Sequence, residues 1–227
     1  MKANLIFIAL LVGSSATAQA STIVFSNLQT GDARQCGCAI EWGRQLGTQP
    51  GDPLESLSAG DAFTVLSGTD FTLDSIELAA GIISGDNRLS ISLNSDKNGM
   101  PGSILESFEL DNQMGRFGKD HPPLVAESVF HPVLMAGVTY WVLATTTDPL
   151  AEAGWFANNT LDTGPIFTRD SYFYAFDPSC CVRTDLRDAF SVLGIPVHAI
   201  PEASTAGTAA VGLAFIIAGL IPRRSAG

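Results

Sequence analysis

The sequence is poor in the residues that most often carry catalysis. It has only three histidines, His121, His131 and His198, and the first two each precede a proline, which favours extended or turn backbone. Neither of these two has a cysteine, aspartate or histidine at the spacing of a metal site, and the Gly-x-Ser-x-Gly, phosphate-loop and His-Glu-x-x-His motifs are missing. We therefore identify no catalytic residue, no cofactor and no metal centre. The 23 aspartates and glutamates leave a carboxylate pair for glycoside hydrolysis open, although nothing singles out two of them.

Positive charge is also scarce, with 12 lysines and arginines and a net charge of −11. Lys2, Arg223 and Arg224 lie outside residues 21–200, as does only one acidic residue, Glu202, so this middle part is more acidic than the whole chain. An acidic surface repels phosphate backbones and anionic lipid, and we expect no nucleic-acid partner. It is compatible with divalent cations or neutral glycans, and equally with simple solubility.

Long apolar runs are confined to the two ends of the chain. At the start, Lys2 precedes the apolar residues 5–12, and Ala18 and Ala20 form a small-x-small cleavage site. This order is typical of a secretory signal peptide, here residues 1–20, which signal peptidase would remove after Ala20. The run is short for a bilayer core of about 30 Å, which favours cleavage over an uncleaved anchor. The mature protein is therefore predicted to work outside the cytoplasm.

The second apolar run, residues 206–221, is uncharged and is followed by Arg223 and Arg224. A helix over this stretch would cover roughly 24 Å at about 1.5 Å per residue, which is marginal for a bilayer. Trailing arginines stay on the cytoplasmic side of a membrane. We therefore predict a transmembrane helix over residues 206–221 that holds the chain in the inner membrane with its body outside.

Pro201 and Glu202 stand just before this helix. The order of a short Pro-Glu motif, an apolar helix and an arginine pair resembles the PEP-CTERM sorting tail of Gram-negative bacteria, which is processed by exosortase. Pro201 and Glu202 match the first two motif positions, whereas Ala203 replaces the usual second proline. The resemblance covers residues 201–227 and implies transient residence in the inner membrane, an exosortase-like partner enzyme and a final place in the envelope or outside the cell. A plain tail anchor that is never cut is the alternative.

The body, residues 21–200, shows short stretches in which apolar and polar residues alternate. Leu89, Ile91 and Leu93 alternate with serines, and the same period of two predicts strands at residues 72–78 and 138–144. Turn signals occur at residues 84–87 and 96–99, and Pro101 and Gly102 suggest a second bend. No long amphipathic helix competes. We therefore predict a single all-β domain, an antiparallel β-sandwich of the jelly-roll kind.

Several short motifs of the body occur in a recognisable order. Phe25-Ser26-Asn27-Leu28 opens it, Asp96 to Gly102 reads D-x-x-G-x-P-G, and Leu134 to Trp141 reads L-x-x-G-x-x-Y-W. In this order they resemble the choice-of-anchor extracellular domain of the R kind, over most of residues 23–157. Such domains occur with differing surface-anchoring tails, PEP-CTERM among them. The resemblance implies no catalytic residues.

Four cysteines are present, in two clusters: Cys36 and Cys38, and Cys180 and Cys181. An even number in an exported chain predicts disulfides. Pairing Cys180 with its neighbour requires a strained ring, so cross-links between the two clusters are favoured, which would join the first and last parts of the body. Zinc binding is disfavoured because Cys-x-x-Cys spacing is missing.

The remaining site candidates are few. Asp96 and Asn98 could ligate calcium through oxygen, although two such ligands make a poor site. Trp155 is the better candidate for a glycan contact, whereas Trp141 lies in a strand pattern typical of the core. Together these features predict an exported envelope or extracellular-matrix protein with a structural or binding role, with exopolysaccharide as a candidate partner. The alternative is a secreted glycan-acting hydrolase with an unrecognised carboxylate pair.

Overall fold

The computed structural model describes residues 20–29, 37–45, 54–118, 121–146, 148, 151–168 and 186–197, of which 37–45, 54–57 and 168 are described by their backbone alone. Every regular element in these ranges is a β-strand, which confirms the all-β prediction. None of the described segments forms a helix long and apolar enough to cross a membrane. The predicted signal peptide up to residue 19, Cys36, Cys180, Cys181 and the tail from residue 201 lie outside the described residues.

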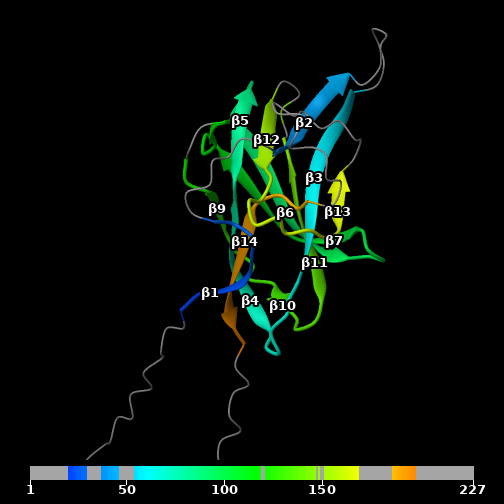
Figure 1. Cartoon of the computed structure of the whole chain (residues 1–227), viewed down its shortest axis with the longest axis vertical. Helices are drawn as coiled ribbons and strands as arrows, with labels where there is room; N and C mark the ends of the chain where they lie inside the picture. Colours follow the sequence, from blue (N-terminus) through cyan, green and yellow to red (C-terminus); the bar gives the residue numbers. More distant parts are fainter. Residues whose placement is uncertain are drawn as a thin grey trace, which may run out of the picture. The chain divides into compact units, whose positions relative to one another are not determined.

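The strands form two sheets (Figure 1). The smaller sheet has five strands, which in spatial order are β1 (Thr22–Ser26), β14 (Phe190–Pro196), β4 (Phe71–Leu78) and β10 (Val133–Leu134), with β9 (Leu124–Glu127) also paired to β4. All of its pairings are antiparallel. The first and the last described strands of the body are therefore neighbours.

The larger sheet has nine strands and is antiparallel except where β5 and β8 run in parallel. Its order is β7 (Pro101–Asp111), β6 (Arg88–Asp96), β11 (Thr139–Thr145), β3 (Leu54–Thr64), β2 (Gly37–Gln45), β12 (Glu152–Phe156), β5 (Ala80–Ser84) and β8 (Gly115–Arg116), with β13 (Ile166–Thr168) also paired to β3.

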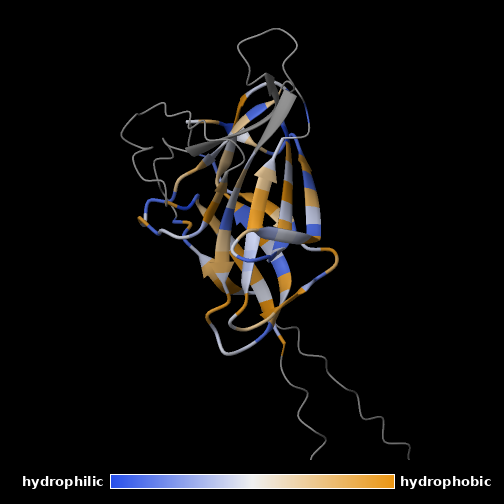
Figure 2. Ribbon diagram, turned by 90° about the vertical axis from the view of Figure 1, so that its right-hand side faces the viewer, coloured by the Kyte–Doolittle hydropathy of each residue, from blue (hydrophilic) through white to orange (hydrophobic). Residues whose placement is uncertain are grey.

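The main hydrophobic core receives side chains from both sheets. Leu89, Ile91 and Leu93 of β6 are fully buried in it, whereas Ser90 and Ser92 between them are half-buried, as their alternation predicts. Figure 2 shows hydrophobic and hydrophilic residues alternating along several strands. Burying each leucine or isoleucine contributes about 1.5–3 kcal/mol, so the period of two is the main reason that these segments become strands.

The three strands predicted from the sequence correspond to β4, β6 and β11. The predicted turn after β6 is also present, with Asn98 and Gly99 at positive φ angles of 59° and 78°. The expected bend at Pro101 and Gly102 is wrong, because both residues belong to β7. The backbone N–H of Lys97 donates to the carbonyl of Met100 at 2.8 Å, so the chain has already reversed before Pro101. A proline is tolerated at the first position of a strand.

Both ends of the body lie at the same end of the five-stranded sheet. β1 begins at Thr22, which pairs with Gly194, and β14 ends at Pro196, which pairs with Phe71. In Figure 1 these strand ends lie toward the lower end of the body. The chain therefore enters and leaves the body on one side.

Candidate functional site

Asn27, from the opening motif of the body, is buried and forms hydrogen bonds with the backbone at the start of β14. Its backbone N–H donates to the carbonyl of Phe190 at 3.1 Å, and its side-chain oxygen accepts the N–H of Phe190 at 2.8 Å. Its side-chain nitrogen donates to the carbonyl of Asp188 at 2.9 Å. One amide side chain thus satisfies backbone groups at the entrance of β14, which would otherwise be buried without partners.

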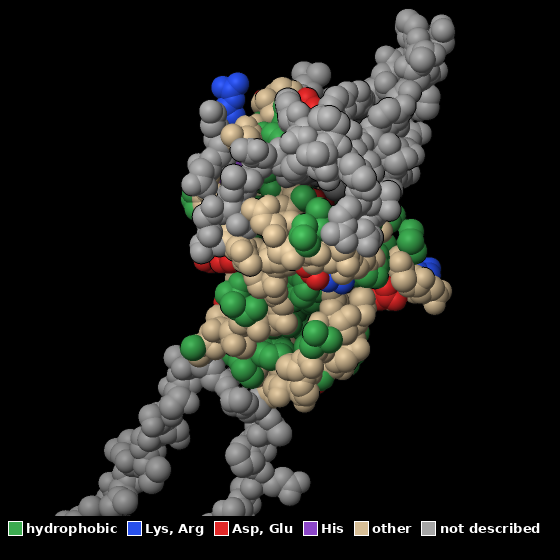
Figure 3. Space-filling model, in the orientation of Figure 1, with side chains coloured by type: hydrophobic (Ala, Val, Ile, Leu, Met, Phe, Trp, Pro, Cys, Tyr) green, Lys and Arg blue, Asp and Glu red, His purple; other side chains and the backbone are tan. Residues whose placement is uncertain are grey.

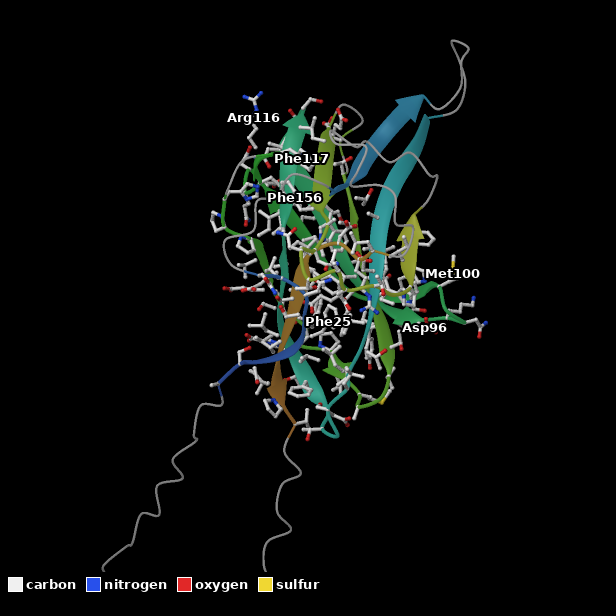
Figure 4. The ribbon with its side chains drawn as sticks, viewed as in Figure 1. Phe25, Asp96, Met100, Arg116, Phe117 and Phe156 are labelled. Atoms are coloured by element: carbon white, nitrogen blue, oxygen red, sulfur yellow. The ribbon has the colours of Figure 1, made fainter. Side chains whose placement is uncertain are left out.

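Two other motifs of the body meet in space. The indole N–H of Trp141 donates to Oδ1 of Asp96 at 2.8 Å, and the N–H of Gly99 donates to Oδ2 of Asp96 at 3.1 Å. The hydrogen bond from Trp141, followed by that from Gly99, lowers the pKa of Asp96. Figure 4 places Asp96 next to the tip of the β6–β7 hairpin, where Met100 lies.

These contacts bear on the calcium candidates. Both oxygens of Asp96 already accept hydrogen bonds that shape the turn, and Asn98 is one of its positive-φ residues. In the part of the chain that the structure describes, no three His, Cys, Asp or Glu residues are grouped to hold a metal ion. The geometry of Asp96 and Asn98 is that of a β-turn.

Trp155 does not have the exposure that a glycan contact requires, and this prediction is wrong. Its side chain is 0% exposed, and its indole N–H donates to the carbonyl of Ala189 at 3.0 Å. It lies in β12, where it packs edge-on against Phe190 with ring centroids 5.8 Å apart. Trp141 is also buried, as its strand pattern predicts.

The most unusual chemistry of the described residues is a buried acidic cluster, formed by Asp61, Asp162, Arg187 and Asp188. Asp61 lies in β3 at 1% exposure and shares its strand face with Phe63 of the core. Its Oδ2 accepts the backbone N–H of Asp188 at 3.0 Å, and Asp188 is 4% exposed. Oδ1 of Asp61 accepts no hydrogen bond. The carboxyl group of Asp61 thus meets the backbone of Asp188 across 127 residues of sequence.

The other two members of the cluster form an ion pair. Nη1 of Arg187 donates to Oδ2 of Asp162 at 2.9 Å, with the side chains 14% and 33% exposed. The Arg187 guanidinium also lies 5.5 Å from the centroid of the Phe25 ring. Asn158 holds the segments of Asp162 and Arg187 together, because its side-chain nitrogen donates to the carbonyls of Asp162 and Arg187 at 2.9 and 2.6 Å. The single guanidinium is therefore already paired with a carboxylate other than Asp61.

Burial raises the pKa of Asp61 well above its usual range, and the adjacent charge of Asp188 raises it further. The N–H of Asp188 and the charge of Arg187 act in the opposite direction, but more weakly. An acid next to a second carboxylate is an arrangement that hydrolases use. At the low exposure of both residues, however, a sugar cannot reach them.

Glu106 is a further buried acid that sequence reasoning missed. It lies in β7, the edge strand of the larger sheet, and is 3% exposed. Its carboxylate accepts hydrogen bonds from the hydroxyl of Ser128 at 2.6 Å and from the N–H groups of Val129 and Phe130 at 2.6 and 3.0 Å. These residues directly follow β9, an edge strand of the smaller sheet. Glu106 therefore fastens the edges of the two sheets together.

Burial alone would raise the pKa of Glu106, but the hydrogen bonds from Ser128, Phe130 and Val129 together hold it below its usual value. The carboxylate is therefore kept ionised in the folded protein. The signal for its burial was present in the sequence, because Glu106 shares the alternation of Phe108 and Leu110, which point into the core. Its partners after β9 carry no such signal.

Among the described side chains on the face drawn in Figure 3, the few Lys and Arg residues are scattered and form no patch. Comparisons with family models, with curated proteins and with solved structures gave no match. The resemblances to a PEP-CTERM tail and to a choice-of-anchor domain thus rest on the sequence motifs.

Proposed function

We propose that this chain is an exported envelope or extracellular-matrix protein with a structural or binding role, sorted by an exosortase-type system. In this proposal a signal peptide, residues 1–20, precedes a jelly-roll-like sandwich, and the tail from Pro201 carries a temporary membrane helix over residues 206–221. The observation that carries the structural role is the use of the polar motif residues. Asn27 and Asp96 both connect separate elements of the fold.

The positions of the two body ends support the sorting part of the proposal. Thr22 and Pro196 lie at the same end of the five-stranded sheet, so a tail after Pro196 would hold the body by one end. Loops at the opposite end, such as residues 85–87 between β5 and β6, would then be free to meet matrix material. Exopolysaccharide is the partner that we expect there.

The sorting tail is tested by replacing Pro201 and Glu202 with alanine, followed by cell fractionation. We expect the wild type to lose its tail and leave the inner membrane, and the double variant to stay there at full length. A matched control replaces Ser204 with alanine and should behave as the wild type. Ala203→Pro restores the usual motif and should be processed at least as completely. Retention of both wild type and double variant with intact tails would refute sorting and indicate an ordinary anchor.

The hydrolase alternative is tested on Asp61 and Asp188, two buried acidic residues that influence each other electrostatically. The purified protein is incubated with exopolysaccharide, and both the retained protein and the released sugar are measured. Retention without release supports the binding role. Release that disappears in both Asp61→Asn and Asp188→Asn, while the variants remain folded, would favour the hydrolase.

A further inference from the structure

We propose that the end of the body at which β14 stops is a membrane-contact surface, which rests on the lipid surface while the tail holds the chain in the bilayer. The surface consists of Leu66, Val133 and Met135. This inference rests on the membrane helix of the proposed function, but it does not require that the tail is cut.

The three side chains of this surface are large, apolar and open to water. Leu66, in the loop after β3, is 87% exposed. Val133 in β10 and Met135 just after it are 50% and 51% exposed. Apolar side chains exposed on one end of a protein are stabilised when they move from water to the boundary between headgroups and acyl chains.

Leu66 and Met135 lie close together because their loops are hydrogen-bonded to each other. The N–H of Gly137 donates to the carbonyl of Val65 at 2.8 Å, and the N–H of Val65 donates to the carbonyl of Val138 at 3.1 Å. The loop after β3 and the loop after β10 therefore form one end of the body.

The last strand of the body ends beside these loops. Phe71, at the start of β4, pairs with Leu134 of β10 on one side and with Pro196 of β14 on the other. Val133 precedes Leu134 and pairs with Thr72. The chain thus leaves the body at its apolar end, where the lower ends of β4, β10 and β14 lie in Figure 1.

The chain that follows limits how far this end can be from a membrane. Only residues 197–205 separate Pro196 from the apolar run at residues 206–221. Even when fully extended, a stretch of this length spans at most about 36 Å. With the apolar run in the bilayer, lipid is therefore always within this distance of the surface. Such tethering raises the effective concentration of the partner, so weak apolar contacts are sufficient for binding.

The apolar end also carries little charge. Residues 65–72, 132–139 and 194–196, which form it, are all described and contain one charged residue, Asp70. Its carboxylate accepts the N–H of Ala136 at 2.8 Å. The whole chain has a net charge of −11, which repels anionic lipid, whereas this end can approach a bilayer with little repulsion. Asp70 restricts the contact to the headgroup level, because burying its charge in the acyl region is costly.

Other exposed apolar side chains of the body have charged neighbours. Val125, which is 44% exposed in β9, pairs with Glu77 of β4. Met100 is 51% exposed, and its carbonyl accepts the N–H of Lys97 at 2.8 Å. In Figure 3 the hydrophobic side chains on the lower part of the body have few charged ones among them. Val125 and Met100 therefore serve as matched controls.

The contact is tested with the full chain, tail included, in vesicles of phosphatidylcholine with brominated acyl chains, which quench tryptophan at short range. Val133→Trp is the probe and Val125→Trp its control, because both valines pair with β4, at positions roughly 17 Å apart. We expect Val133→Trp to lose more fluorescence than the wild type, and Val125→Trp to show no extra loss.

A second set of variants tests whether the apolar side chains are responsible. Adding Leu66→Glu and Met135→Glu to Val133→Trp should abolish the extra quenching, because charges cannot enter the acyl boundary cheaply. Adding Met100→Glu, at the same 51% exposure as Met135, should leave the quenching intact. All of these side chains are exposed, so the fold should be retained, and circular dichroism checks this.

Flotation with the vesicles separates this inference from the proposed function. A chain that does not float refutes both the membrane helix and the contact surface. A chain that floats without extra quenching at Val133→Trp, or with equal quenching at Val125→Trp, overturns the contact surface alone. Dimers found by chemical crosslinking in place of quenching would assign the surface to a second copy of the chain. Quenching by a chain whose tail is never cut in cells would support the contact and refute only sorting.

Discussion

Replacing Glu106 with alanine should weaken the connection between the two sheets and destabilise the whole body. The carboxylate accepts three hydrogen bonds, all from residues that follow β9. A hydrogen bond to a charged group contributes about 1.5–3 kcal/mol, but neighbouring bonds do not add fully. Water can also reach the freed amides, because the side chains of Val129 and Phe130 are exposed. We therefore expect a loss of about 3 kcal/mol, a large part of the roughly 5–15 kcal/mol of a typical domain.

The assay is equilibrium unfolding in urea at pH 7, followed by tryptophan fluorescence. Glu106→Gln keeps the size of the side chain and one acceptor oxygen, and should cost only about 1 kcal/mol. Glu109→Ala is the matched control on the same strand, because Glu109 is exposed and its carboxylate accepts, among the described residues, only the hydroxyl of Ser90 at 2.8 Å. This change should stay within about 0.5 kcal/mol. Equal effects of Glu106→Ala and Glu109→Ala would refute the reasoning.

Two further predictions concern the larger sheet. Trp155→Phe removes the donor to the buried carbonyl of Ala189 and should reduce the free energy of unfolding by about 1–3 kcal/mol, while leaving any glycan retention unchanged in a pull-down assay. Gly154→Ala should cost about 1–3 kcal/mol in urea unfolding, because the new Cβ would lie 2.1 Å from Cε2 of Phe117. Phe117 stacks on Phe156 at 4.5 Å, as Figure 4 shows for the labelled pair, so it cannot move without breaking that contact. A wild-type midpoint in Gly154→Ala would contradict the close approach.

The sequence was sufficient to predict those strands in which alternate residues are apolar and form one hydrophobic face. β4, β6 and β11 place leucine, isoleucine or aromatic residues on the core side, and a shift of one residue would expose them. β3 could not be found in this way. Around Asp61 its residues are Gly60 and Ala62, too small to produce a periodic signal, and the acid itself occupies an inward position.

The sites could be predicted only in part for a related reason. Alternate residues of a strand point to the same face, so Glu106 points inward with Phe108 and Leu110 of β7. Asp61 points inward with Phe63 of β3 for the same reason. The partners of these acids could not be predicted from the sequence, because Asp188 lies 127 residues from Asp61 and Ser128 lies 22 residues from Glu106. Contacts over such separations depend on the sheet order, which periodicity does not determine. The expected exposure of Trp155 is wrong because this residue lies in β12, which is paired on both sides with β2 and β5, and its side chain is buried.

The buried acids Glu106 and Asp61 should act on stability in opposite directions with pH, which would give the body a defined pH range. Glu106 has a lowered pKa, so its contribution is present above the ordinary glutamate pKa of about 4.3 and is lost as the pH falls through the folded value. Asp61 has a raised pKa, so its contribution is lost as the pH rises. Because the chain has a net charge of −11, general repulsion among its carboxylates also grows with pH, and the alkaline side alone does not identify Asp61. The variants separate these effects: Glu106→Gln should flatten only the acid side of the stability curve, and Asp61→Asn only the alkaline side. A change of both sides in either variant would mean that the two carboxyl groups do not act independently.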